Sequence, residues 1–155
     1  MKNVLLIVML TLGCIVANAQ EYTIQSEGVD NNGNYVVRIV GSTKKKPLKT
    51  AQDLVRRYAV HGVMFRGVTA AKGYSAQPPL VKDPNVEENK RAFFEAFWRE
   101  NAYFRYASIT PSSLTVMKNK QSKMIETSAL ITVSQEQLQK YLEENGIIKG
   151  VSNLW

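Results

Sequence analysis

The stretch YTIQSEGVDNNGNYVVRIV, residues 22–40, decides how the chain begins to fold. Its two arms, Tyr22–Ile24 and Tyr35–Val40, are rich in β-branched and aromatic residues, a composition typical of strands. Between them lies Asp30–Asn34, whose Asn-Gly pair tolerates positive φ angles and so favours a tight turn. The stretch therefore predicts a β-hairpin.

A helix and then a long irregular segment should follow the hairpin. From Leu48 the apolar residues recur at helical spacing, and they are Ala51, Leu54, Val55, Tyr58, Ala59 and Val63. We expect Thr50 to cap this helix early, and the helix to reach about Phe65 and stop at Gly67. Residues 67–86 show no periodicity and are rich in glycine and proline, which is typical of a binding loop or a disordered loop.

The second half of the chain predicts further helices and strands. We expect a helix from about Glu87 to Asn101, with Tyr103–Tyr106 either extending it or beginning a strand. Ser113–Met117 and Met124–Val133 have strand composition. Ser134, with Gln137 three residues later, has capping-box spacing and predicts a helix that ends at Asn145-Gly146. Ile147–Ile148 would add a short last strand.

This order of elements predicts an α+β domain. Two strands, a helix, a long loop, a helix, two strands and a helix are best accommodated in a two-layer sandwich. We expect a mostly antiparallel sheet of about four or five strands, packed by about three helices. Residues 20–155 are expected to form this single domain.

Residues 1–19 predict a secretory signal peptide. Lys2 supplies a positive start, Val4–Leu12 is an apolar run, and Ala17 and Ala19 are the small residues that a signal peptidase reads. The run is shorter than the roughly 20 residues that a transmembrane helix needs. We therefore expect an exported protein, in the periplasm or associated with the outer membrane, and no transmembrane span in the mature chain.

The sole cysteine, Cys14, lies inside this predicted signal, so the mature chain would hold neither a disulfide nor a thiol nucleophile. Lipidation of Cys14 is the less favoured alternative, because Ile15–Ala17 continue the apolar segment. The full chain carries a net charge of +7. For an exported protein this favours an anionic envelope component over nucleic acid as a partner, or a solvated surface that aids solubility.

No pattern of catalytic or metal-binding residues is complete. His61 is the one histidine and would have to serve every serine or metal mechanism, so we interpret it as packed or hydrogen-bonded at a helix edge. Gly73–Gln77 resembles a nucleophile elbow but has Gln77 in place of the second glycine. Glu87, Glu88, Glu95 and Glu100 are interpreted as solvated helix surface. We predict no metal and no cofactor.

Two groups of residues are candidates for binding. The long loop and its flanks carry three cations and a tyrosine, which suit a protein or anionic contact; they are Arg66, Lys72, Tyr74 and Lys82. Lys44, Lys45 and Lys46 follow the hairpin, where they either grip an anionic surface or blunt an exposed strand edge, and the pattern favours the second account. The aromatic residues of the 87–101 helix are interpreted as core.

Three blocks of sequence carry a family resemblance: Ala59–Val68, Phe93–Phe97 and Leu138–Ile148. Together with the Asn18-Ala19-Gln20 signal ending they resemble a group of small secreted proteins of Bacteroidetes to which no activity is assigned. The resemblance implies a compartment but no reaction. More loosely, the arrangement of helices and strands is similar to envelope lipoprotein and flagellar-assembly accessory domains, a likeness of fold alone.

The sequence thus leaves three hypotheses about function. The first is a non-enzymatic cell-envelope protein that binds another envelope protein or an anionic surface component. The second is a small hydrolase acting on envelope polymers through His61 or a helix carboxylate. The third is a structural homo-oligomer formed through an exposed sheet edge.

Overall fold

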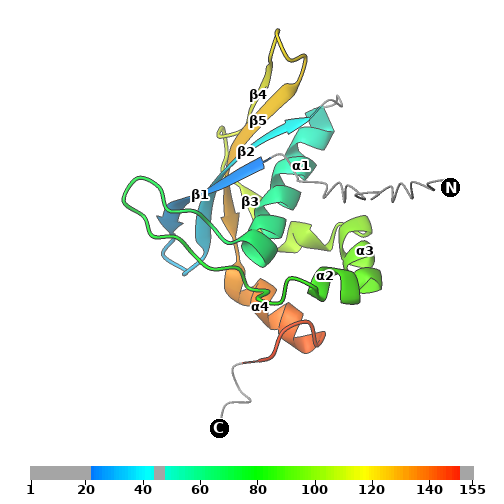
Figure 1. Cartoon of the computed structure of the whole chain (residues 1–155). Coiled ribbons are helices and arrows are strands. Elements are labelled where there is room, and N and C mark those ends of the chain that lie inside the picture. The colour runs from blue at the N-terminus through cyan, green and yellow to red at the C-terminus, as the bar shows by residue number, and fades with distance from the viewer. Residues whose placement is uncertain (1–21, 44–47, 151–155) are drawn as a thin grey trace, which may run out of the picture.

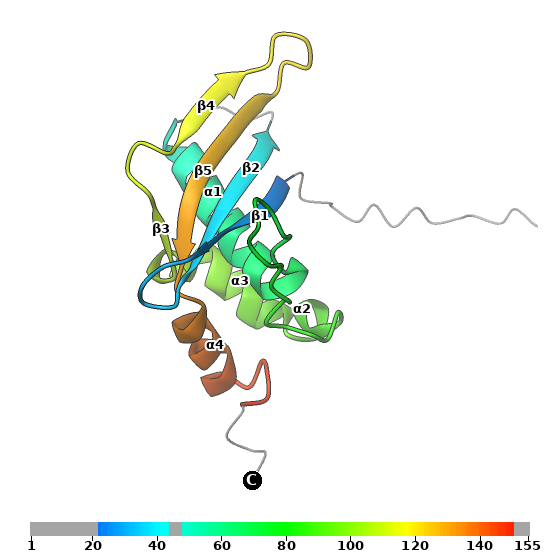
Figure 2. The ribbon, with the colours of Figure 1, turned by 90° about the vertical axis from the view of Figure 1, so that its left-hand side faces the viewer.

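A five-stranded antiparallel sheet and four α-helices build the fold in the computed structural model, which describes residues 22–43 and 48–150 (Figure 1). The strands are β1 (Tyr22–Val29), β2 (Tyr35–Thr43), β3 (Ala107–Ile109), β4 (Thr115–Lys118) and β5 (Ile125–Val133). The order across the sheet is β1-β2-β5-β3, and β4 also pairs with β5, beyond β3 along the same edge (Figure 2). The predicted α+β class and strand number are confirmed.

The predicted hairpin is β1–β2, in antiparallel register from Tyr22 opposite Gly41 to Val29 opposite Tyr35. Its turn is held by Asp30, whose Oδ1 accepts hydrogen bonds from the backbone N–H of Asn32 and of Asn34 at 2.8 and 2.9 Å. Gly33 supplies the positive φ of 82° that the turn requires. Hydrogen bonds from Asn34 lower the pKa of Asp30. These features make Asp30–Asn34 a turn, as the sequence predicts.

Helix α1 (Leu48–His61) lies across one face of the sheet and continues into a π-helical turn, η1 (Gly62–Arg66). Gly67 ends it with φ of 74°, as predicted, and its N–H donates to the carbonyl of Gly62. Thr50 lies inside the helix, so the prediction that it caps the helix is wrong. Alternate residues of the strands, such as Ile39 of β2 and Ile131 of β5, share the core with Val55 and Val60 of α1, and each of the four is at most 1% exposed. Burying one such side chain contributes about 1.5–3 kcal/mol.

The predicted helix at 87–101 is two helices, α2 (Val86–Asn89) and α3 (Arg91–Arg99), separated at Lys90. Phe94 and Phe97 of α3 are buried and Phe93 is half-buried, which confirms these aromatic side chains as core. Residues 102–105 form a 3-10 turn, η2 (Ala102–Arg105), and neither extend the helix nor begin a strand. Strand β3, which follows, was not predicted.

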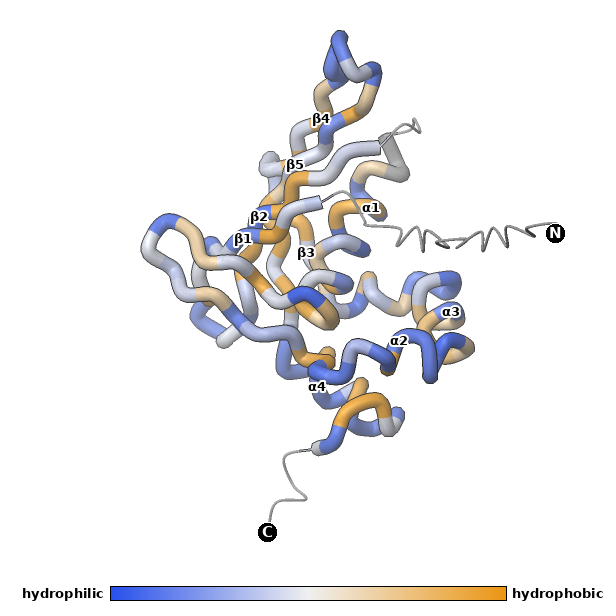
Figure 3. Tube along the Cα trace, viewed as in Figure 1, coloured by the Kyte–Doolittle hydropathy of each residue, from blue (hydrophilic) through white to orange (hydrophobic). Residues whose placement is uncertain are grey.

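Helix α4 (Gln135–Glu144) closes the fold beside the end of β5 (Figure 1). It begins after Ser134 and ends at Asn145, as predicted, but the Ser134 side chain makes no capping hydrogen bond. The capping-box prediction is therefore wrong. Ile147 is buried against the core, yet residues 147–148 form no strand. Leu138 and Leu142 of α4 are buried. The trace of α4 carries both apolar and hydrophilic residues (Figure 3).

The segment after Gly67 is ordered as a small hairpin, contrary to the predicted irregular loop. Val68 and Gln77 exchange backbone hydrogen bonds of 2.8 and 2.9 Å, and Ala71 pairs with Tyr74 in the same way. Lys72 and Gly73, the two turn residues, have φ of 50° and 84°, the positive values of a two-residue hairpin turn. The sequence signal is weak because lysine replaces the usual asparagine.

This 68–77 hairpin lies along the outer edge of β1. Thr69 accepts a hydrogen bond from the Ser26 N–H at 2.8 Å, and its own N–H donates to the Ile24 carbonyl at 3.2 Å. The Thr69 hydroxyl donates to the same carbonyl at 2.6 Å. The 68–77 hairpin thereby covers part of the sheet edge that β1 forms.

Candidate functional site

The predicted binding residues of the long loop lie in three separate places. Lys72 is at the tip of the 68–77 hairpin, where its Nζ lies 3.0 Å from Oε1 of Glu27. The same oxygen receives Arg38 Nε at 2.6 Å, and these hydrogen bonds, from Arg38 first and then Lys72, lower the pKa of Glu27. Arg38 and Lys72 therefore share the single negative charge of Glu27, and the contact with Lys72 helps to hold the hairpin on β1.

Tyr74 completes the attachment of this hairpin. Its ring lies so close to Gly28 that a Cβ at Gly28 would be 2.9 Å from the ring Cε1. Even so, Tyr74 remains 47% exposed. Lys72 and Tyr74 thus share one place beside β1, away from the other two predicted residues.

Arg66 lies at the end of η1, on the start of β1. One guanidinium N–H donates to the Tyr22 carbonyl at 3.0 Å, and the guanidinium carbon lies 4.5 Å from the centroid of the Tyr22 ring. Arg66 itself is exposed. These contacts give it a structural role whatever else it binds.

His61 and Tyr22 form a hydrogen-bonded pair, with 2.7 Å between Nδ1 and the phenol oxygen. Burial, reinforced by the charges of Arg66 and Arg57, lowers the pKa of His61 to about 4. Burial raises the pKa of Tyr22 to about 12. Near neutral pH both groups are therefore uncharged, as the interpretation of His61 as a hydrogen-bonded helix-edge residue expects.

The surroundings of His61 are aromatic. Its ring centroid lies 5.1 Å from that of Phe65 and 6.1 Å from that of Trp98. Arg57 in turn lies with its guanidinium carbon 5.2 Å from the Trp98 ring. These contacts tie η1 and α1 to α3, and they suit a packed histidine better than a base that must reach a substrate.

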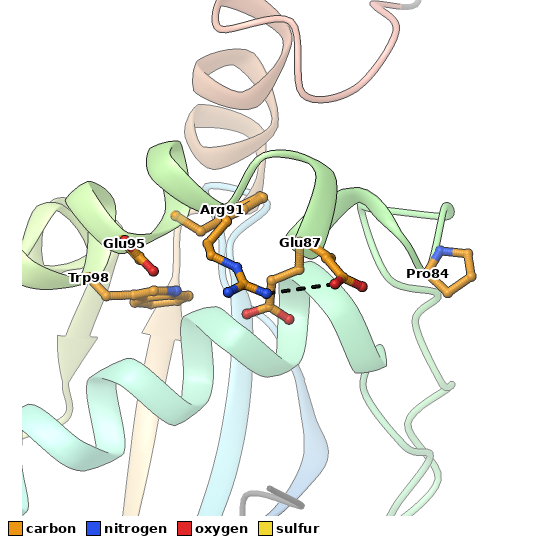
Figure 4. Close-up of a pocket in the computed structure, with 7 residues that line it drawn as sticks. Pro84, Glu87, Arg91, Glu95 and Trp98 are labelled. Atoms are coloured by element: carbon orange, nitrogen blue, oxygen red, sulfur yellow. Dashed lines mark ion pairs between the residues drawn. The ribbon is translucent and has the colours of Figure 1, made fainter. Parts of the chain in front are cut away.

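A cleft of 470 Å³ opens beside this cluster, along α2 and α3 (Figure 4). Its lining combines three carboxylates with one guanidinium and apolar side chains; it comprises Pro84, Glu87, Glu88, Arg91, Phe94, Glu95 and Trp98. Arg91 Nη2 lies 3.7 Å from Oε1 of Glu88. Partial burial raises the pKa of Glu87, an effect that Arg57 offsets in part. With an excess of carboxylates, this cleft does not suit an anionic partner.

A larger groove, of 730 Å³, runs between residues 78–83 and α4. Pro78–Val81 form one wall, and Gln135 and Gln139 of α4 form the other, with Ile147 and Ile148 beyond them. Two backbone hydrogen bonds hold the first wall, from Leu80 N–H to the Val63 carbonyl at 3.1 Å and from Val81 N–H to Met64 at 2.9 Å. The groove is therefore built on the core and not on a free loop.

Lys82 and Lys149 line this groove together with one carboxylate, Asp83. Both lysines are exposed, and neither forms an ion pair with another residue in 22–43 or 48–150. Tyr35, at the first position of β2, adds an aromatic ring whose hydroxyl lies 3.4 Å from Gln77 Oε1. Of the predicted loop residues, only Lys82 lies here. The sequence does not predict the remaining residues of the groove, because the groove joins segments that lie far apart in the chain.

Several predictions concern residues outside the described ranges. Lys44, Lys45 and Lys46 are among them, as are Cys14, Ala17, Ala19 and the rest of the predicted signal peptide. Within the ranges described, no helix is of the length and apolarity that crossing a bilayer takes. The same residues contain no cluster of three or more side chains able to hold a metal ion.

Comparison with known proteins found no matching family model, curated protein or solved structure. The resemblance to secreted Bacteroidetes proteins therefore stays a prediction.

Proposed function

We propose that the chain is an exported, non-enzymatic cell-envelope protein that binds a segment of another envelope protein. The observation that carries this proposal is the groove between residues 78–83 and α4. Its volume of 730 Å³ lies within the range of roughly 300–1,000 Å³ usual for binding pockets. Its walls offer apolar side chains with a few polar groups, the mixture by which binding pockets achieve both affinity and orientation.

The chemistry of the groove favours an extended, acidic peptide segment. Leu80, Ile147 and Ile148 offer contacts to apolar side chains, and Gln135 and Gln139 offer amide groups to a peptide backbone. Lys82 and Lys149 exceed Asp83 in charge, so a carboxylate on the ligand would gain complementarity. An anionic envelope component that carries carboxylates or phosphates on an apolar scaffold is the alternative ligand.

No comparable observation favours the hydrolase. His61, its best candidate, has a pKa lowered to about 4, which makes it a weak base near neutral pH, and its Nδ1 already contacts Tyr22. The homo-oligomer is likewise not favoured, because the 68–77 hairpin covers part of the β1 edge and the strands at the other edge are short.

Photo-crosslinking in the native envelope tests the proposal. A photoreactive amino acid is placed at Pro78 on one wall or at Ile148 on the other, with Ser108, exposed on β3, as the control position. The expected result is the same product from Pro78 and Ile148 and none from Ser108. Mass spectrometry should assign it to a segment of an envelope protein that contains aspartate or glutamate. Equal yields at all three positions, or no product, would contradict the proposal.

A further inference from the structure

The β4–β5 hairpin projects from the body at the end of the sheet opposite α4 (Figures 1 and 2). Residues 119–124 connect its strands, and β4 pairs only with β5 within the described part of the chain. All four residues of β4 are exposed to solvent. We call residues 115–126 the finger.

The finger combines exposed apolar side chains with lysines. Met117 is 63% exposed, more than any other large apolar side chain in the described ranges, and Val116 is 39% exposed. Lys118, Lys120 and Lys123 are exposed, and none forms an ion pair with another described residue. Glu126 is the single carboxylate in residues 115–126. The finger is therefore cationic and apolar at once.

Hydrogen bonds fix the shape of its tip. The Asn119 side-chain oxygen accepts hydrogen bonds from the backbone N–H of Gln121 and of Ser122, at 3.0 and 3.1 Å. The Asn119 N–H donates to the Met124 carbonyl at 2.9 Å. The lysines are thus presented on a preformed turn, so little ordering of the backbone would accompany binding.

We infer that the finger docks on the surface of an anionic phospholipid bilayer. Lys118, Lys120 and Lys123 contact lipid phosphates, while Met117, the most exposed apolar side chain of the finger, enters the boundary between head groups and acyl chains. This is the combination by which proteins bind membrane surfaces without spanning them. The finger and the groove lie at opposite ends of the sheet, because β2 starts with Tyr35 in the groove and ends with Thr43 opposite Ile125. One molecule can therefore bind a membrane and a protein together.

Other partners fit the finger less well. Residues 115–126 contain no aromatic side chain on which nucleic acid bases could stack. A protein strand would find only the four residues of β4 to pair with, and the last of them is Lys118. An anionic membrane surface needs no preformed pocket, and each lysine near it strengthens binding roughly fivefold.

A fluorescent label at position 117 tests this inference. In a Cys14→Ser background of the full chain, Met117→Cys carries an environment-sensitive dye, and Glu136→Cys on α4 carries the same dye as the control. With vesicles of phosphatidylethanolamine and phosphatidylglycerol, the emission at 117 should shift to the blue. It should not shift at 136, or with pure phosphatidylcholine vesicles. Salt at about 1 M, where the screening length is about 3 Å, should reverse the shift.

The apolar run Val4–Leu12 could attach an unprocessed chain to vesicles. A dye at position 117 distinguishes that attachment from docking by the finger, because it responds only where residue 117 meets the lipid. Binding without a shift at 117 would overturn the inference, as would no binding. Replacing Lys118, Lys120 and Lys123 by glutamine should weaken binding roughly 100-fold. The same replacement of Lys90, Arg105 and Lys140, which are exposed and lie outside both the groove and the finger, should leave it nearly unchanged, and equal losses would contradict the inference. Because the groove is tested by crosslinking, failure here leaves the proposed function standing.

Discussion

At the scale of single residues, the pair of His61 and Tyr22 shows how packing sets chemistry. The phenol of β1 reaches the imidazole at the end of α1, and aromatic rings of η1 and α3 enclose it. Enclosure removes water, which disfavours the charged imidazolium, and the nearby guanidinium groups of Arg66 and Arg57 add to the effect. The one histidine of the chain is thereby made too weak a base to accept a proton readily near neutral pH.

This environment predicts how stability depends on pH. The pKa of His61 is about 4 in the folded protein against 6.5 for the free residue, so the unfolded chain binds more protons between these values. Folding stability should be complete above about pH 6.5 and fall as the pH decreases toward 4, by up to about 3 kcal/mol. Urea unfolding at several pH values measures the decrease. The variant His61→Asn should lose less stability over the same window.

The titration can also be observed directly, since the chain has one histidine. The imidazole protons in an NMR titration should shift with a midpoint near pH 4. A midpoint at or above pH 6.5 would show that the ring is solvated and would reopen the case for a general base.

Gly41 in β2 illustrates a close approach that admits no side chain. A Cβ there would lie 2.6 Å from Cε2 of Tyr58, whose ring stacks on Tyr22 with 4.5 Å between centroids. Gly41→Ala should therefore destabilise the protein by about 1–3 kcal/mol, because the stacked rings must move. Chemical denaturation measures the loss. Val40→Thr, at the exposed neighbouring position, should cost less than about 1 kcal/mol, and comparable losses in both variants would refute this reading.

At the scale of elements, the 68–77 hairpin depends on its turn. Gly73 has a φ of 84°, a conformation that a β-branched residue adopts only with strain. Gly73→Val should therefore loosen the hairpin and speed amide hydrogen exchange at Val68 and Gln77, while Ile39 in the core keeps its protection. Gly73→Asn is the matched control and should change little, because asparagine tolerates positive φ. Unchanged exchange in the valine variant would argue against the turn.

The start of α4 gives a second test of an element. Ser134 makes no side-chain cap, so Ser134→Ala should cost less than about 0.5 kcal/mol, below the roughly 1 kcal/mol of a working cap. Ser113→Ala is the contrasting variant. The Ser113 hydroxyl donates to the Thr110 carbonyl at 2.7 Å and accepts from the Leu130 N–H at 3.0 Å. That loss should be about 1–2 kcal/mol. A larger loss of stability in Ser134→Ala than in Ser113→Ala would contradict this account and would favour a capping box at Ser134.

The elements also show where sequence reasoning succeeds and fails. The β1–β2 hairpin, the stop of η1 at Gly67 and strand β5 were predictable because each has strong local signals. Strand β3 has only three residues, too few to show a period of two. The helix breaks at Lys90, between α2 and α3, without a glycine or proline that would allow the break to be predicted. There the burial of Phe94 and Phe97 against the core outweighs local helix propensity.

At the scale of the whole molecule, the sheet separates two surfaces. The groove lies at the α4 end and the finger at the other, with α1 covering one face of the sheet between them (Figure 1). Lys82 was predicted as a binding residue and lines the groove. Tyr35, Gln139 and Lys149 could not be predicted, because they meet Lys82 only when β2, α4 and residues 78–83 are folded together. The arrangement predicts that charge in the groove, and not total charge, controls partner binding.

The most direct test of that claim compares two double variants with the same change in net charge. Lys82→Glu/Lys149→Glu reverses the two lysines of the groove, whereas Lys90→Glu/Lys140→Glu reverses two exposed lysines outside it. The measured quantity is the yield of the envelope crosslink from position 78. We expect roughly a tenfold or greater loss in the first variant, because like charges would then face each other, and little change in the second. Equal yields in the two variants would contradict the account.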